Sequence, residues 1–267
     1  MAETQGGDVL VSFRGVQKSY DGETLIVKDL NLDIRKGEFL TLLGPSGSGK
    51  TTSLMMLAGF ETPTAGEILL AGRSINNVPP HKRDIGMVFQ NYALFPHMTV
   101  AENLAFPLSV RGMSKTDVKE RVKRALSMVQ LDAFAGRYPA QLSGGQQQRV
   151  AIARALTQKA EVILADEPIA SLDPESARKV MDILADINRH DGKTVVVTLH
   201  QVDYALRYCP RAVALKGGRI LFDGSSEHLS EGFLNELYGA EGDTPLLFSD
   251  RARRGAESQP ELTLARA

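Results

Sequence analysis

One glycine-rich segment constrains the fold of this 267-residue chain more than any other. It reads Gly44-Pro45-Ser46-Gly47-Ser48-Gly49-Lys50-Thr51 and matches the pattern G-x-x-x-x-G-K-[ST]. A short apolar run, 39–43, precedes it, and the helix-forming run 52–58 follows it. The segment therefore predicts a loop between a buried strand and a helix N-terminus, where backbone N–H groups bind phosphate oxygens.

The residue types of this segment fit a nucleotide better than a structural turn. Glycines let the backbone curl around an anion, Lys50 supplies a cation for the β- and γ-phosphates, and the Thr51 hydroxyl can bind Mg²⁺. A glycine-rich turn with a purely structural role would not explain the lysine and the threonine. The predicted ATP-binding residues of the loop are Gly44, Pro45, Ser46, Gly47, Ser48, Gly49, Lys50, Thr51 and Thr52.

A second apolar run ends in two carboxylates. Residues 162–165 precede Asp166 and Glu167. Asp166 is predicted to hold the metal ion, directly or through water. Glu167 lies one position further along, where a carboxylate can face the γ-phosphate and act as general base toward an attacking water. Alone this pattern would be ambiguous, but together with the phosphate loop it indicates hydrolysis.

The spacing of apolar runs predicts an α/β fold. The runs 39–43, 162–165, 194–199 and 211–215 are strand-sized and are separated by helical patterns, which favours a mostly parallel, buried sheet. Residues 216–219 predict a hairpin turn.

Residues 91–155 are predicted to form a mainly helical insertion. Ser114 indicates a helix start, and a further helix over 102–110 is expected to be interrupted by Pro107. The basic face of the helix after Ser114 favours a solvated surface over a specific binding patch. We expect one domain over 1–240 and a polar tail over 241–267, in which Leu246-Leu247-Phe248 could dock.

Composition excludes several classes of protein. Lys plus Arg number 31 and Asp plus Glu 32, so the net charge of −1 disfavours a protein that coats nucleic acid. The single cysteine, Cys209, excludes an intrachain disulfide and a multi-cysteine metal site, and fits a reducing compartment. No secretory signal and no apolar stretch long enough to span a membrane is visible, so no membrane-spanning segment is expected.

One short motif resembles the signature of a known protein family. Leu142-Ser143-Gly144-Gly145-Gln146, followed by the helical run 147–156, closely resembles the signature motif of ATP-binding cassette (ABC) proteins. The resemblance covers most of residues 11–224. It implies a P-loop NTPase core with a mostly parallel sheet, an N-terminal antiparallel β subdomain, and a helical insertion that carries the signature.

The resemblance also assigns roles outside the phosphate loop. Tyr20 matches the aromatic residue that stacks on adenine, Gln90 the glutamine that contacts Mg²⁺ and water, and His200 the histidine that senses the γ-phosphate. Read without the family, Tyr20 could be a surface aromatic and His200 an ordinary residue at a strand end. The implied catalytic residues are Glu167, His200 and Gln90, and the implied Mg²⁺ ligands are Thr51, Gln90 and Asp166.

In this family the signature acts in trans. Ser143-Gly144-Gly145 before a helix is itself an anion-binding helix start. The resemblance implies a head-to-tail homodimer with two ATP molecules in its interface, closed by ATP binding and opened after hydrolysis. The residues expected to serve the partner's ATP are Ser143, Gly144, Gly145, Gln146 and Asp173.

A cassette alone on a chain is expected to act on other proteins. The resemblance implies an ATP hydrolase that drives a membrane importer, with permease subunits, a solute-binding protein, and a peripheral location on the cytoplasmic face of the inner membrane. The alternatives are an exporter or lipoprotein-release subunit, or a non-transport ABC ATPase. The non-transport kinds would need a long heptad insertion or a second cassette, and the sequence shows neither.

The resemblance is split with respect to the solute. Residues 11–156 look most like ATPases of polyamine (spermidine or putrescine) importers, whereas 157–224 look more like the phosphonate-importer ATPase. The change near Thr157 could reflect natural divergence or recombination. The chain ends before the extra C-terminal β-rich domain usual in the polyamine type. The permease-binding groove is expected in the N-terminal part, which favours a polyamine-type permease, whereas the C-terminal part suggests a phosphonate. Both solutes therefore remain candidates.

Overall fold

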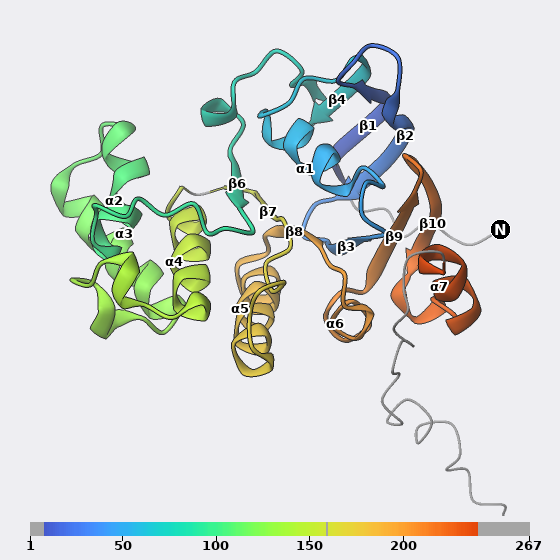
Figure 1. Cartoon of the computed structure of the whole chain (residues 1–267). Coiled ribbons are helices and arrows are strands. Elements are labelled where there is room, and N and C mark those ends of the chain that lie inside the picture. Colours follow the sequence, from blue (N-terminus) through green and yellow to red (C-terminus); the bar gives the residue numbers. More distant parts are fainter. Residues whose placement is uncertain (1–7, 159, 240–267) are drawn as a thin grey trace, which may run out of the picture.

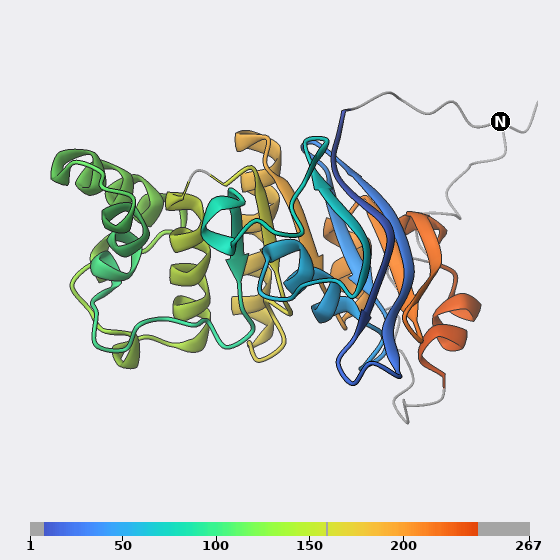
Figure 2. The same cartoon turned by 90° about the horizontal axis from the view of Figure 1, so that it is seen from above.

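The computed structural model describes residues 8–158 and 160–239. Two β-sheets lie side by side, and a group of helices projects from the larger sheet on the side away from the smaller one (Figures 1 and 2). The predicted tail over 241–267, with Leu246-Leu247-Phe248, lies outside the described residues.

The larger sheet carries the phosphate loop. β3 pairs in parallel with β8 and β9, β8 with β7, and β7 with β6, while β10 runs antiparallel at the edge. Every residue of β3, β7 and β8 is buried, which explains their nearly continuous apolar sequences. In spatial order the strands are β10 (Arg219–Ser225), β9 (Arg211–Lys216), β3 (Phe39–Leu43), β8 (Thr194–Thr198), β7 (Val162–Ala165) and β6 (Ile85–Val88).

The smaller sheet is antiparallel throughout, in the order β2-β1-β4-β5. Its apolar face packs on α1 and on the larger sheet in one core that includes Phe13, Leu42 and Leu54. The mostly parallel sheet and the antiparallel β subdomain are therefore confirmed. The strands are β1 (Val9–Ser19), β2 (Leu25–Arg35), β4 (Ala65–Leu70) and β5 (Arg73–Ser74).

Seven α-helices and four short 3₁₀ helices complete the described part of the chain. The α-helices are α1 (Lys50–Ala58), α2 (Val100–Val110), α3 (Lys115–Met128), α4 (Gly144–Thr157), α5 (Pro174–Asp191), α6 (Val202–Tyr208) and α7 (Glu231–Tyr238). The 3₁₀ helices are η1 (Pro80–Lys82), η2 (Asp132–Phe134), η3 (Pro139–Gln141) and η4 (Ser226–His228).

Side-chain caps explain where the helices of the insertion begin. Thr99 and Ser143 each form a capping box with the residue three positions later, and the Ser114 hydroxyl accepts a hydrogen bond from the Asp117 N–H, as the sequence predicts. One expectation was wrong: α2 begins at Val100 and continues through Pro107 instead of being interrupted there. α2, α3 and α4 pack against one another and share a core with α5.

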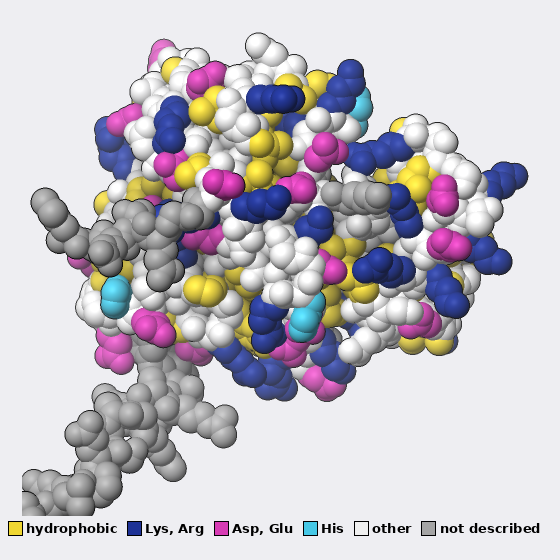
Figure 3. Space-filling view, turned by 180° about the vertical axis from the view of Figure 1, so that it is seen from behind, with side chains coloured by type: hydrophobic (Ala, Val, Ile, Leu, Met, Phe, Trp, Pro, Cys, Tyr) yellow, Lys and Arg dark blue, Asp and Glu magenta, His cyan; other side chains and the backbone are white. Residues whose placement is uncertain are grey.

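No helix of the described residues is long and apolar enough to cross a membrane. The view from behind shows basic and acidic side chains interspersed over the surface, in keeping with the nearly balanced composition (Figure 3).

Candidate nucleotide-binding site

The phosphate loop lies at the carboxyl end of β3 and leads directly into α1. Gly44 has a φ of 141°, and a Cβ there would stand 2.1 Å from the Leu215 carbonyl oxygen, so only glycine fits this position. Gly49 caps α1 with a φ of 98°. The Gly44 N–H donates to the Tyr238 hydroxyl at 3.1 Å, a contact from α7 that no local sequence pattern predicts.

Lys50 lies inside the loop. Its Nζ donates to the carbonyl oxygens of Gly44 at 2.7 Å and Pro45 at 2.9 Å, and the residue is only 5% exposed. Burial lowers the pKa of the Lys50 ammonium, and the nearby carboxylates of Glu167 and Asp166 partly offset this effect. The Lys50 Nζ also donates to the Ser48 hydroxyl at 3.5 Å, so its ammonium has neutral oxygen partners that a charged phosphate can replace.

Three residues from three elements meet beside Lys50. The Thr51 hydroxyl donates to Asp166 Oδ1 at 3.0 Å, and the Thr198 hydroxyl donates to the same oxygen at 2.9 Å. The carboxyl ends of the parallel strands β7 and β8 bring Asp166 and Thr198 to the start of α1. Thr198 is a residue that sequence reasoning missed, although a polar residue at the end of an apolar strand was a visible signal.

Glu167 lies next to this group and pairs with His200. Glu167 Oε1 and His200 Nε2 are 2.6 Å apart, and the Glu167 N–H donates to the Thr198 hydroxyl at 2.7 Å. Glu167 adopts a left-handed conformation with a φ of 47°, which is strained for a residue with a side chain. The glutamate side chain is 19% exposed, so water can reach it.

The donor set fits a magnesium ion. Mg²⁺ in phosphate sites takes one or two protein oxygens and completes its shell with phosphate and water oxygens. The Thr51 hydroxyl and the buried Asp166 carboxylate, 3.0 Å apart, are a pair of that kind. In the described residues no group of three or more His, Cys, Asp and Glu forms a metal-binding cluster, so an all-protein cage is not what the site provides.

Gln90 follows β6 and is exposed, and no hydrogen bond joins its side chain to another described residue. The structure therefore does not bring Gln90 into contact with Thr51 or Asp166. The next residues, Tyr92 and Ala93, form a left-handed turn with φ values of 63° and 47°. Arg154 of α4 donates to the carbonyl oxygen of Ala93 at 2.7 Å and holds this turn against the helix.

Tyr20 lies just beyond β1 on the tip of the β1–β2 hairpin and is 61% exposed. Val27, which pairs with Lys18 across this hairpin, also packs on the phosphate loop, since a Cβ at Gly49 would stand 3.1 Å from its side chain. The hairpin that carries Tyr20 is thus in contact with the loop.

The residues expected to act in trans gather at two adjacent helix N-termini. Ser143 caps α4, and Asp173 caps α5 by accepting from the Ser176 N–H at 3.0 Å. The two ends touch, because a Cβ at Gly145 would lie 2.6 Å from the Ser176 hydroxyl. α4 is separated from α1 by α5 and the sheet (Figures 1 and 2). In the described residues, the Ser143 side chain hydrogen-bonds with Gln146 and not with the phosphate loop of its own chain.

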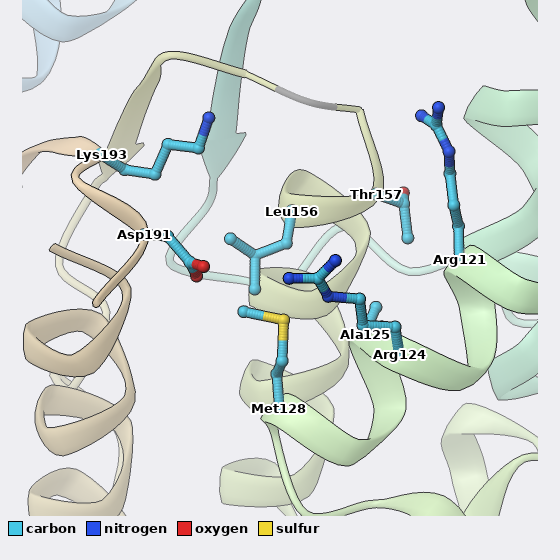
Figure 4. A pocket seen from close by; sticks show the side chains of 8 residues that line it. All are labelled: Arg121, Arg124, Ala125, Met128, Leu156, Thr157, Asp191 and Lys193. Atoms are coloured by element: carbon cyan, nitrogen blue, oxygen red, sulfur yellow. The ribbon is translucent and has the colours of Figure 1, made fainter. Parts of the chain in front are cut away.

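Two of the pockets in the described part of the chain are larger than 300 Å³ and lie away from the phosphate loop. One of about 350 Å³ opens between α3, the end of α4 and the turn after α5 (Figure 4), and its charged lining residues are Arg121, Arg124, Asp191 and Lys193. It contains none of the predicted site residues. It does show that part of the basic face of α3 lines a hollow, where the sequence favoured a simple solvated surface.

The second pocket, of about 360 Å³, is an aromatic groove between the sheet core and the helical insertion. Phe60 and Phe106 are 54% and 40% exposed, and Arg154 reaches the groove from α4. We refer to this pocket as the aromatic groove; its aromatic and charged lining residues are Phe60, His81, Phe89, Phe95, Phe106 and Arg154.

A phosphate loop closed on a buried lysine, in an α/β sheet whose next strands end in Asp-Glu and Thr-Leu-His, defines a P-loop ATPase. The family model for the ABC transporter matches residues 27–170. The chain belongs to this ABC transporter family, as the signature string predicts.

Curated relatives support the same family. The chain is 64% identical over 257 residues to a phosphonates import ATP-binding protein of Pseudomonas aeruginosa strain UCBPP-PA14, an alignment that covers 90% of this chain and 92% of the relative. It is 47% identical over 224 residues to a spermidine/putrescine import ATP-binding protein of Oleidesulfovibrio alaskensis, covering 84% of this chain and 60% of that relative. The resemblance to phosphonate-import relatives therefore extends to both sides of Thr157.

Solved structures of ATP-binding cassettes superpose on this chain and support the same family. The ATP-binding cassette MJ0796, in a dimeric post-hydrolysis state bound to ADP and Pi, superposes with a TM-score of 0.75 at 39% identity, covering 82% of this chain and all of that one. The cassette cbiO1 from Clostridium perfringens, part of a transporter complex, superposes with a TM-score of 0.78 at 27% identity, covering 88% of this chain and 96% of that one.

Proposed function

We propose that this chain is the ATP-binding and ATP-hydrolysing subunit of a membrane importer, and that the imported solute is a phosphonate. The hydrolytic part rests chiefly on one observation: Thr51, Asp166, Glu167 and His200 come from distant segments and converge beside the buried Lys50. The importer and the phosphonate rest on the 64% identity to a phosphonate-import protein across 90% of the chain.

The residues of the loop bind and orient the nucleotide. Backbone N–H groups of residues 46–51 and the N-terminus of α1 hold the phosphates, and Lys50 exchanges its carbonyl partners for phosphate oxygens. Thr51 and Asp166 would hold Mg²⁺, with Gln90 joining them when its loop moves inward. Bound there, the ion would neutralise charge on the β- and γ-phosphates.

Glu167 accepts a proton from the attacking water. His200, whose Nε2 lies 2.6 Å from the carboxylate, fixes the orientation of Glu167 and can reach the γ-phosphate. Thr198 holds the Glu167 backbone and the Asp166 side chain together, so the base and the metal ligand keep a fixed relation.

Two copies are proposed to close head to tail around two ATP molecules. Ser143, Gly144, Gly145, Gln146 and Asp173 of one copy would contact the nucleotide bound by the other. This agrees with the distance of α4 from its own phosphate loop (Figure 1). It also agrees with the dimeric states in which the MJ0796 cassette was solved.

The aromatic groove is the proposed binding site for a cytoplasmic helix of the permease. An apolar groove with exposed Phe60 and Phe106 suits the apolar face of such a helix. Its floor includes Phe89 and Phe95, on either side of Gln90, so an occupant would press on the segment that carries this glutamine. The chain would then be a peripheral protein on the cytoplasmic side of the cell membrane, with a solute-binding protein in the full complex.

A polyamine is the second candidate solute, because relatives named for spermidine and putrescine import share 44–47% identity with the chain. The chain spans about 60% of the length of those relatives. The relatives described above are named for phosphonate or polyamine import and not for export, lipoprotein release or a non-transport role.

The test is transport-coupled hydrolysis. The chain would be co-purified with its permease, placed in liposomes with the solute-binding protein, and assayed for ATP turnover. A phosphonate, and not putrescine, should stimulate turnover several-fold. Stimulation by putrescine alone would replace the solute with the second candidate, and failure to bind MgATP would contradict the whole proposal.

A further inference from the structure

The exposed ring of Tyr20 is backed by a cation. Lys18 places its Nζ 4.8 Å from the centre of the Tyr20 ring, inside the range of a cation–π interaction. We propose that Lys18 is a positioning residue for the nucleobase: it fixes the Tyr20 ring as a shelf and leaves the opposite face for adenine. The inference rests on the proposed ATP-binding function and adds a residue to it.

Lys18 is held firmly enough to serve as such a support. The residue is only 9% exposed, and its ammonium pairs with Glu61 Oε2 at 2.8 Å and with the Thr62 carbonyl oxygen at 2.9 Å. Two partners from the segment before β4 therefore fix the ammonium in place. A lysine that served only to solubilise the hairpin would point into water and leave its rotamers free.

The backbone around the shelf is fixed by the same segment. The Ser19 N–H donates to the Thr64 hydroxyl at 3.0 Å, and that hydroxyl contacts the Ser19 carbonyl at 3.3 Å. The Thr64 N–H also donates to the Gln17 carbonyl. The residue directly before Tyr20 is thus tied down, while no hydrogen bond restrains the tyrosine side chain itself among the described residues. Lys18 is the group that limits the motion of the ring.

The position of the Tyr20 ring is also fixed relative to the phosphate loop. Lys18 pairs with Val27 across the β1–β2 hairpin, and Val27 packs on Gly49. A nucleotide whose phosphates lie in the loop therefore has its base near the end of this hairpin. Stacking of a base on an aromatic face gains from a ring that is already oriented, because less conformational entropy is lost on binding.

The experiment separates base recognition from phosphate recognition. Dissociation constants would be measured by calorimetry for ATP and for inorganic tripolyphosphate, which lacks the base, in the parent and in Lys18→Met. Methionine keeps a long apolar side chain and removes the charge. We expect ATP binding to weaken about 3- to 10-fold, in the range of a partly desolvated cation–π contact, with tripolyphosphate binding unchanged.

Three further variants sharpen the result. Lys18→Arg should restore ATP binding, because a guanidinium can also lie over the ring and pair with Glu61. Lys28→Met makes the same charge change on the same hairpin without a described ion pair, and should bind both ligands like the parent. In a Tyr20→Ala background, Lys18→Met should cause no additional loss of ATP affinity.

The outcomes are distinguishable. An equal loss of ATP and tripolyphosphate affinity, or a loss that persists in the Tyr20→Ala background, would show a general structural role and overturn the inference. No change for either ligand would also overturn it. If the parent chain itself binds neither ligand, the proposed ATP-binding function fails, independently of Lys18.

Discussion

One threonine links the two acidic residues of the site. Thr198 donates to the Asp166 carboxylate and accepts from the Glu167 N–H, so the proposed metal ligand and the backbone of the proposed general base are held together. Glu167 keeps a strained left-handed backbone because this hydrogen bond and the pairing with His200 both hold it there. Sequence reasoning located Asp166 and Glu167 from their places at a strand end and His200 from the family resemblance, but it did not identify Thr198.

Replacing Glu167 by glutamine should slow hydrolysis and preserve ATP binding. The amide keeps the size of the side chain and cannot accept the proton from water, so turnover should fall by about 10²- to 10⁴-fold. The variant should accumulate as an ATP-bound dimer, seen by gel filtration with MgATP. Turnover equal to that of the parent would rule out Glu167 as the base.

Replacing Lys50 by alanine should impair binding itself. The variant loses the cation that faces the phosphates, so ATP affinity should fall at least tenfold, the worth of a charge-assisted contact of about 1.5–3 kcal/mol. Titration with a fluorescent ATP analogue measures this change, and a thermal melt of the variant controls for folding. An unchanged affinity would argue against the phosphate cradle.

The start of α4 shows why the signature is placed on a helix. Ser143 caps the helix by accepting a hydrogen bond from the Gln146 N–H, and the two glycines that follow pack closely on Tyr92 and Ser176. Gly145 is required because a Cβ there would collide with Ser176 at the start of α5. The two helix ends form one surface, and that surface is where a second copy is expected.

Ser143→Arg should abolish hydrolysis while each monomer still binds ATP nearly normally, because the serine is proposed to serve the partner's nucleotide. An arginine at this cap would obstruct closure of the dimer. Mixing this variant with Lys50→Ala should restore part of the activity, since one site of the mixed dimer is then complete. ATPase assays of the two variants alone and mixed measure this; an associated but inactive mixture would contradict the in-trans arrangement.

At the scale of the whole molecule, two features lie where the helical insertion meets the sheet core. Arg154 links α4 to the turn after Gln90, and the aromatic groove opens beside that turn. The full chain has a net charge of only −1, and basic and acidic side chains are interspersed on the face shown in Figure 3. We expect shape and apolar contact in the groove to select the permease.

Phe106→Asp should separate hydrolysis from permease binding. A charge in the aromatic groove would disfavour an apolar helix, whereas the phosphate loop is untouched. The isolated variant should hydrolyse ATP at close to the parent rate and should no longer co-purify with the permease. Val110→Asp is the matched control on the same helix, because Val110 is 71% exposed and lies outside the groove. Loss of binding in both variants would show that the groove is not the site.

The sequence by itself determined the elements whose signals are local. The phosphate loop, the strand end at Asp166, and the caps at Ser114 and Ser143 each follow from residue types at short spacing. Hydrophobic runs likewise predicted the parallel sheet, because strands buried on both faces must be apolar throughout.

Only the tertiary structure decided which distant groups meet. The hydrogen bonds of Thr198 with the Asp166 carboxylate and the Glu167 N–H, the pairing of Lys18 with Glu61 and Thr62, and the Tyr238 contact with Gly44 join residues 31 to 194 positions apart. Such contacts carry no local pattern, since each depends on how strands are ordered and on which side chains the packing leaves facing one another. The continuation of α2 through Pro107 is of the same kind: local propensity favours a break, and packing against α3 and α4 outweighs it.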